Sequence, residues 1–265
     1  METGIVQIAF VPVRREPSEQ SEQVTQLLFG ELCEIMENKG NWYNIRAEYD
    51  HYQGWCDRKM ILPLDDSVYT KLIQSDPLIL PDPFLSVTRT DTGSKGIIPA
   101  GSAAWQFMRK ENSFVNGETT FRFDRQPSDI ETASMSSGIE KMTAGFLNTP
   151  YLWGGKSTFG CDCSGFVQTV YKIFGQALPR DAAEQVNSGE TIPFIHDADP
   201  GDLAFFDNEE GEIIHVGIVL NENRIIHASG KVRIDAFDQE GIYNYELGRY
   251  THKLRIIKRI KGHGI

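Results

Sequence analysis

Short apolar runs separated by turn residues dominate the first part of the chain, residues 1–64. Runs of this length, interrupted by Gly, Pro and Asn, predict β-strands rather than helices. The expected strands are residues 5–8, 11–14, 24–29, 32–36, 42–46 and 52–56. Short strands that follow one another closely predict a small β-barrel.

Residues 65–127 show a looser version of the same pattern. Pro77, Pro81 and Pro83 interrupt its beginning. Beyond them, apolar runs predict strands at residues 84–88, 96–99, 103–107, 113–115 and 119–123. This spacing predicts a second, diverged β-barrel.

The pattern changes at residue 128, after which apolar residues recur at helical spacing. Helices are expected at about residues 130–147 and 163–174. A short third helix is expected after Arg180, because Asp181 can cap it and Glu184 stands at the capping-box distance. Strands are expected at residues 203–206, 215–220, 224–229 and 254–260. Helices followed by an antiparallel sheet are typical of an α+β domain, which we place at residues 128–265.

The formal net charge of −11 excludes some partners. Nucleic-acid binding depends on clustered Lys and Arg, which the chain lacks, so nucleic acid is not an expected partner. No run approaches the roughly 18 apolar residues of a membrane helix, so membrane insertion is not expected. The N-terminus shows no signal peptide, and a cytoplasmic protein is expected if Met1 is the natural start. Nothing in the sequence indicates the oligomeric state.

A candidate nucleophile lies in the stretch 151–166, where a glycine-rich loop leads into the helical pattern at Cys163. The helix dipole and unpaired backbone N–H groups stabilise a thiolate at a helix start, which predicts a depressed pKa. A buried structural cysteine is the alternative. Cys161 lies in the preceding loop, and Cys33 and Cys56 are expected in the core. Four cysteines are too sparse for a disulfide framework, so reduced thiols are expected.

Two histidines are candidates for the base that such a thiol requires. His215 begins an apolar strand, and His227 lies near the end of the next strand after a tight connection. The start of one hairpin strand lies beside the end of the other, so the two side chains can meet. One imidazole would accept the thiol proton while the other fixes its tautomer.

The same side chains allow a rival hypothesis, a zinc site formed by Cys161, Cys163, His215 and His227. Zinc sites usually place their cysteines further apart than the single intervening residue found here, which strains a tetrahedral site. That spacing also departs from the C-x-x-C of redox pairs. We therefore expect neither a metal nor another cofactor.

Several ordered motifs carry a resemblance to known families. The segments Val11-Pro12-Val13-Arg14, Asn41 to Arg46 and Tyr52 to Trp55 resemble a bacterial SH3-like domain. The remaining motifs resemble the NlpC-type cysteine peptidases, which cleave bacterial cell-wall peptides on a papain-like α+β fold. They are Tyr151 to Gly155, Gly160 to Phe166, Pro200 to Leu203, His215 to Ile218 and Ile226 to Ala228. Together they cover about residues 130 to 260.

This resemblance implies a role for each matching residue. Cys163 is the nucleophile, His215 the general base and His227 the polar third member. The Asp162 side chain and the Cys163 backbone N–H are implied near the oxyanion or the substrate. The residues implied to bind substrate are Tyr151, Trp153, Asp162, Ser164, Arg180, Asp181 and Tyr52.

SH3-like domains ahead of the catalytic domain are the arrangement of the γ-D-glutamyl-L-diamino-acid endopeptidases. Those enzymes contact the substrate through an Arg-Asp-Ser step, where this chain has Arg180-Asp181-Ala182. Arg180 is suited to the carboxylate of D-glutamate through forked hydrogen bonds, and Asp181 to a free amine. Ala182 removes one of the implied hydrogen bonds. Tyr52, or alternatively Tyr43, would close the far end of the groove.

The implied function is hydrolysis of the γ-D-glutamyl-L-diamino acid bond in murein-derived peptides with a free N-terminal L-alanine, a step of murein peptide recycling. Two alternatives stay open. The chain could be a wall-binding module with weak or no hydrolysis, or a thiol acyltransferase or amidase acting on another substrate.

Overall fold

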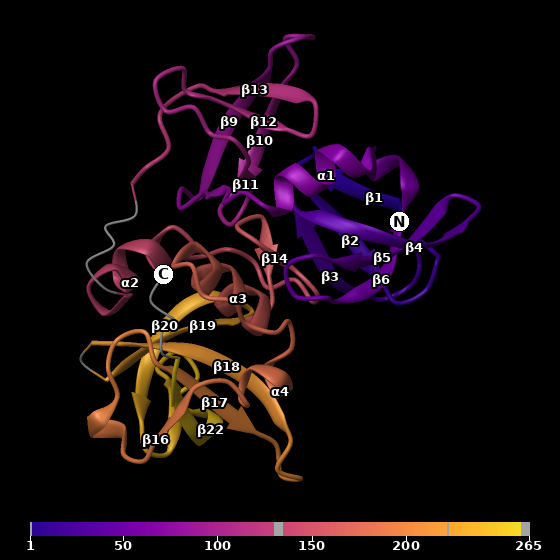
Figure 1. Ribbon diagram of the computed structural model, residues 1–265. Coiled ribbons are helices and arrows are strands. Elements are labelled where there is room, and N and C mark those ends of the chain that lie inside the picture. The colour runs from indigo at the N-terminus through magenta and orange to yellow at the C-terminus, as the bar shows by residue number, and fades with distance from the viewer. Residues whose placement is uncertain (1, 130–134, 222, 261–265) are drawn as a thin grey trace. The chain divides into compact units, whose positions relative to one another are not determined.

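The computed structural model describes residues 2–129, 135–221 and 223–260. The chain divides into two compact units (Figure 1). Unit 1 comprises Met1–Asp129 and Trp153–Thr158, and unit 2 comprises Ile130–Leu152 and Phe159–Ile265. In the described part of the chain, no helix has the length and apolar character needed to cross a membrane.

Unit 1 begins with an antiparallel sheet whose strands follow the order β3-β2-β6-β5-β4-β1-β7. The bounds are β1 Glu2–Val6, β2 Phe10–Arg14, β3 Gln23–Leu28, β4 Leu32–Lys39, β5 Trp42–Ala47, β6 Gln53–Asp57, the 3-10 helix η1 Arg58–Met60 and β7 Ile61–Leu64. Alternate residues of these strands face one core. Cys33 and Cys56 lie fully buried in it beside Val11 and Ile45, which confirms their expected place.

The second part of unit 1 is a smaller antiparallel sheet in the order β10-β9-β13-β12, with the pair β11-β8 beside it. The bounds are α1 Asp66–Ile73, β8 Leu78–Ile79, β9 Phe84–Arg89, β10 Lys95–Pro99, β11 Ala103–Ala104, β12 Ser113–Asn116 and β13 Thr119–Phe123. Its core is aromatic: Phe29 meets Phe114 and Phe121 edge-on. Helix α1 was not expected from the sequence, and it buries only Leu72.

One short segment of unit 1 comes from much later in the chain. It holds β14 Lys156–Ser157 and lies in the sequence just before Cys163. The Lys156 ammonium is buried and pairs with the buried Glu31 carboxylate at 3.1 Å. Gly154 has φ +73°, and a Cβ there would lie 2.4 Å from the Gln23 carbonyl oxygen. The expected boundary at residue 128 assigned this segment to the last domain, whereas its contacts place it in unit 1.

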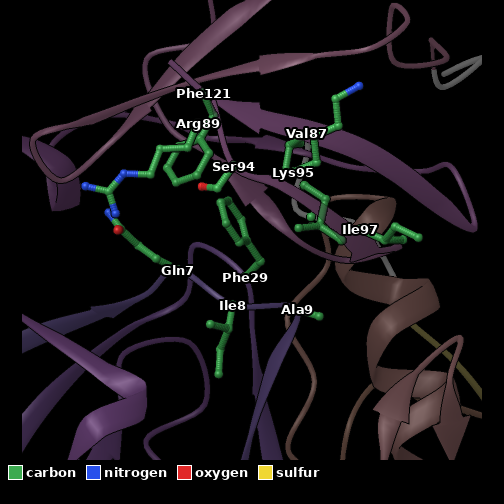
Figure 2. Close-up of a pocket in the computed structure, with 12 residues that line it drawn as sticks. Gln7, Ile8, Ala9, Phe29, Val87, Arg89, Ser94, Lys95, Ile97 and Phe121 are labelled. Carbon is green, nitrogen blue, oxygen red and sulfur yellow. The ribbon is translucent and has the colours of Figure 1, made fainter. Parts of the chain in front are cut away.

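A cavity of about 340 Å³ also lies in unit 1, between its two sheets (Figure 2). Gln7, Ile8, Phe29, Arg89 and Lys95 are among its lining residues. It contains none of the residues that the sequence analysis assigned to chemistry.

Unit 2 is an α+β unit built on a curved antiparallel sheet. The bounds are α2 Met135–Ala144, β15 Gly160–Cys161, α3 Cys163–Ile173, α4 Ala182–Gln185, β16 Glu190–Ile192, the 3-10 helix η2 Ile195–Asp197, β17 Leu203–Asp207, β18 Ile213–Leu220, β19 Arg224–Ser229, β20 Lys231–Asp238, β21 Gly241–Asn244 and β22 Arg249–Arg259. The strand order is β16-β22-β17-β18-β19-β20-β21, and an added pairing of β22 with β21 closes a small barrel. Helix α3 packs on β18 and β19 (Figure 1).

The helices and the central strands of unit 2 confirm the expected elements. The helix expected at residues 130–147 is described from Met135, and residues 130–134 of that expectation lie outside the described residues. The sequence analysis missed β20 and β21. Strand β20 carries Asp235, whose carboxylate reaches the predicted His227.

The buried pair of Lys156 and Glu31 gives a test of how unit 1 holds the late segment. Lys156→Met leaves the Glu31 carboxylate buried without its cation. We expect the free energy of unfolding to fall by about 3 to 5 kcal/mol, the usual cost of breaking a buried ion pair from one side. Urea denaturation measures the loss.

Lys59→Met is the matched control, because Lys59 is 77% exposed and pairs with Asp57 at the surface. Surface pairs contribute only about 0 to 1 kcal/mol. Equal decreases in the free energy of unfolding for the two variants would contradict the larger contribution expected of the buried Lys156–Glu31 pair.

Candidate active site

The N-terminus of α3 positions Cys163. Asp162 is the N-cap residue, and its carboxylate accepts a hydrogen bond from the Gly165 backbone N–H at 2.7 Å. This capping bond begins the helix at Cys163, as the sequence predicted. The Cys163 side chain is buried, and its sulfur accepts hydrogen bonds from the backbone N–H groups of Ser164 and Val216. Since Val216 follows His215, the thiol lies beside the start of the histidine hairpin.

A buried ion pair holds the capping residue in place. The Arg180 guanidinium forms a two-pronged contact with the Asp162 carboxylate, with Nη1 to Oδ1 at 3.1 Å and Nη2 to Oδ2 at 2.6 Å. Its Nη1 also donates to the Ser164 hydroxyl at 2.8 Å. Arg180 is only 1% exposed.

This geometry corrects one expectation. The Arg180 fork was expected to hold a substrate carboxylate, but it is used inside the protein on Asp162. The Asp162 carboxylate, which is buried with Arg180, occupies the guanidinium fork that was expected to bind the substrate. Asp162 and Ser164 accordingly serve the helix start and the buried ion pair.

The thiol does not have the depressed pKa that its helix position predicted. Burial, the largest influence, and the nearby Asp162 carboxylate raise the pKa of Cys163 to about 11. The N–H groups of Val216 and Ser164 and the Arg180 cation act in the opposite direction but do not prevail. The resting residue is therefore a neutral thiol that needs a base.

The hairpin of β18 and β19 brings the two predicted histidines together. Gly217 pairs with His227 in the register, so His215 lies diagonally across from His227. The Nε2 of His215 lies 2.9 Å from the Nδ1 of His227. A Cβ at Gly217 would stand 3.0 Å from the His227 Cβ, so glycine leaves the space that the diagonal contact uses. Both histidines are buried.

Two further residues that the sequence analysis did not identify complete this cluster. Asp235 on β20 lies with Oδ2 at 3.0 Å from the Nε2 of His227, and it is buried. His252 on β22 stacks on the ring of His215 at a centroid distance of 4.2 Å and an interplanar angle of 24°. Neither residue lies in a motif that the sequence shows, because Asp235 and His252 stand outside the two strands that carry His215 and His227.

The pKa values of the histidines favour neutral rings. Burial lowers the pKa of His215 well below 6.5, and the neighbouring His227 and His252 lower it further. Burial also lowers the pKa of His227, although its hydrogen bond to Asp235 opposes the shift. The pKa of His252 falls to about 4, mainly because of burial. A neutral His215 at physiological pH can accept a proton.

Three histidine rings gather in this cluster. One ring nitrogen from each of His215, His227 and His252 lies within 4.8 Å of the others, and neither cysteine of the zinc hypothesis belongs to this group.

The other predicted substrate residues differ in their surroundings. Tyr151 is 36% exposed, and burial together with the nearby Cys163 and Asp162 raises its pKa to about 12. Asp181 is half-buried at the N-cap of α4, although its side chain makes no capping hydrogen bond. Trp153 and Tyr52 belong to unit 1, where the Trp153 indole donates to Glu22 at 2.7 Å.

Comparison with known proteins places the chain in a family. A model described as the NlpC/P60 family matches residues 148–250, and one described as the bacterial dipeptidyl-peptidase Sh3 domain matches residues 13–61. The chain is 35% identical over 241 residues to the gamma-D-glutamyl-L-lysine dipeptidyl-peptidase of Bacillus subtilis, a match that covers 84% of this chain and 78% of that protein. The chain belongs to the NlpC/P60 family.

Two further comparisons extend over most of this NlpC/P60 peptidase. Dipeptidyl-peptidase 6 of Lysinibacillus sphaericus is 27% identical, over 88% of this chain and 91% of that protein. The crystal structure of an NlpC/P60 family protein from Bacillus cereus matches with a TM-score of 0.81 at 19% identity, covering 97% of this chain and 99% of the other. The expected fold class is confirmed: an α+β NlpC/P60 domain preceded by an SH3-like barrel.

The neutrality of the base can be measured directly in this peptidase. An ordinary histidine gains its proton near pH 6.5. We expect the His215 ring to gain its proton well below that pH, because its burial disfavours the charged form. Histidine-selective ¹H–¹⁵N NMR follows each ring. A His215 midpoint at 6.5 or above would contradict the burial argument.

Proposed function

We propose that this NlpC/P60 peptidase hydrolyses the bond between γ-D-glutamate and an L-diamino acid in murein-derived peptides, with Cys163 as nucleophile. The observation that carries the proposal is the buried Cys163, His215 and His227 group in a chain that is 35% identical to a gamma-D-glutamyl-L-lysine dipeptidyl-peptidase. Murein peptide recycling is the physiological role that we infer from this substrate.

The proposed reaction begins with proton transfer. His215 takes the Cys163 proton through Nδ1, because its Nε2 faces His227. The sulfur attacks the γ-carbonyl of D-glutamate, and the diamino acid leaves after its amine takes the proton from His215. Water then attacks the thioester with His215 again as base, which releases L-Ala-D-Glu and restores the thiol.

The first turn of α3 supports the oxyanion of the tetrahedral intermediate. The Cys163 backbone N–H lies at the first helical position, where helix N–H groups lack a partner within the helix. The raised pKa of Tyr151 keeps its hydroxyl protonated at neutral pH, so it can donate a hydrogen bond. Both donors act on charge that exists only in the transition state and the intermediate.

For the peptide we propose a cavity lined by two residues that contact the His215 ring. A cavity of about 560 Å³ is lined in part by Phe206, Ile214 and His252. Phe206 and His252 also contact the His215 ring, at centroid distances of 5.7 Å and 4.2 Å. For the peptide amine we propose Asp181, which is half-buried and follows Arg180 directly.

Loss of the nucleophile is the first test. Cys163→Ala removes the sulfur but keeps a small buried side chain, so the fold is retained. We expect release of L-Ala-D-Glu from L-Ala-γ-D-Glu-L-Lys to fall at least 10³-fold, because removing a catalytic nucleophile lowers kcat by up to about 10⁶. Chromatography with mass detection follows the product. Cys161→Ala is the matched control and should stay active, whereas equal activity of C163A and wild type would end the proposal.

Blocking the peptide amine is the second test. N-acetylation removes the positive charge proposed to pair with Asp181. We expect kcat/KM for the acetylated tripeptide to fall on the order of 10- to 100-fold, because the half-buried Asp181 carboxylate then faces a neutral group. Asp181→Asn should lower kcat/KM for the free peptide and narrow the difference between the two substrates. Equal rates on both substrates in the wild type would remove the amine-binding role from Asp181.

A further inference from the structure

We infer that Asp235 is a positioning residue that fixes the tautomers of both His227 and His215, and so leaves Nδ1 of His215 free to take the Cys163 proton. The inference rests on the proposed function, since it concerns the same thiol and base. It adds a fourth member to that group, from a strand that carries none of the other three.

The contacts form one buried chain across three neighbouring strands. Asp235 Oδ2 lies 3.0 Å from His227 Nε2, and His227 Nδ1 lies 2.9 Å from His215 Nε2. All three side chains are at most 5% exposed. Strands β18, β19 and β20 are consecutive in the sheet, so the order of the strands is the order of the hydrogen bonds.

Arg233 stabilises the ionised form of Asp235, the residue at the outer end of this series of hydrogen bonds. Its Nη2 donates to Asp235 Oδ1 at 2.9 Å, and its Nε lies 2.7 Å from Oδ2. Burial alone would raise the pKa of Asp235, but the hydrogen bonds from His227 and Arg233 outweigh it and lower that pKa. Asp235 is therefore a carboxylate at neutral pH, and a carboxylate only accepts hydrogen bonds.

The polarity of every other bond follows from that carboxylate. His227 must donate through Nε2, so in the neutral ring its Nδ1 carries the lone pair. His215 must then donate through Nε2, which leaves the lone pair on its own Nδ1. When the S–H bond of Cys163 breaks and an N–H bond forms at that nitrogen, the new imidazolium already donates toward His227. The negative charge of Asp235 lies behind it.

An amide at position 235 cannot serve both neighbours. Arg233 only donates and meets both carboxylate oxygens, so an asparagine sets its NH₂ group against an Arg233 donor in either orientation. With the oxygen in the place of Oδ2 the negative charge behind His227 is lost. With the NH₂ group in the place of Oδ2, that group also faces His227 Nε2 and reverses the direction of the hydrogen bonds: His227 accepts at Nε2 and donates at Nδ1. His215 must accept at Nε2, and its proton lies on Nδ1, where the base is needed. The Asp-to-Asn change in a serine-protease triad lowers kcat by about 10⁴ through such a wrong tautomer.

Alkylation of Cys163 by iodoacetamide tests this inference without any peptide substrate. Peptide mapping by mass spectrometry reports Cys163 alone. For Asp235→Asn we expect alkylation near pH 7 to slow at least about 10-fold, in the range for outer carboxylates that orient a histidine. The rate should approach that of the wild type as the solution becomes alkaline enough to ionise the thiol unaided. The titratable groups that contact His215 are His227 and His252, and Cys163 is the group from which we propose it takes the proton.

Asp238→Asn is the matched control, because it makes the same change on the same strand. The Asp238 carboxylate accepts a hydrogen bond from the Tyr250 hydroxyl at 2.6 Å, and it takes no part in the hydrogen bonds that join Asp235, His227 and His215. Its alkylation profile should match the wild type. For Asp235→Ala, added formate should restore part of the rate by returning a carboxylate between His227 and Arg233. A folded D235N protein with the wild-type profile would overturn the inference.

NMR of the wild type provides a test that does not depend on a folded variant. We expect the proton of neutral His215 on Nε2 and that of neutral His227 also on Nε2. A proton on Nδ1 of His215 would overturn the inference. Because neither measurement uses a wall peptide, failure to cleave L-Ala-γ-D-Glu-L-Lys would defeat the proposed substrate and leave the role of Asp235 intact.

Discussion

The buried pair of Asp162 and Arg180 is the interaction on which the active site depends. Asp162 has two tasks that require the same carboxylate: it caps α3 and it neutralises Arg180. A buried carboxylate without a cation would cost several kcal/mol, and the helix start would lose its capping acceptor. The pair therefore fixes where the first turn of α3 begins, and with it the direction of the Cys163 side chain. The fork of Arg180 is suited to this task because it binds both oxygens and prevents rotation of the carboxylate.

The barrel of unit 2 supplies the opposite half of the site. Strands β18, β19 and β20 carry His215, His227 and Asp235, and β22 carries the His252 ring that stacks on His215. Pairing of β22 with β21 closes this sheet, so none of these strands can shift alone. A strand shifted by one residue would turn its side chains to the other face. Closure of the sheet thus preserves the hydrogen bonds from Asp235 through His227 to His215, in which each donor and acceptor is fixed.

The sequence predicted this fold well where local pattern decides the outcome. The helix start at Cys163 and the hairpin that joins His215 to His227 follow from spacing alone. The partner of His227 could not be found that way. In β20 the polar Asp235 is buried and the apolar Ile234 is 36% exposed, which inverts the usual alternation. The burial of Arg180 was hidden for a similar reason, because only the fold shows that Asp162 already occupies its fork.

The neutral resting state explains why so many fixed dipoles surround the thiol. Burial opposes charge on Cys163 and on His215 alike, so the proton transfer that we propose between them creates two charges where the surroundings favour none. Backbone N–H groups of Ser164 and Val216 already point at the sulfur, and Asp235 acts on the imidazolium through His227. These groups are held by α3 and by the sheet, so they need little reorganisation when charge appears. Burial suppresses the thiolate at rest, and the same low-dielectric surroundings strengthen each of these contacts once the proton moves.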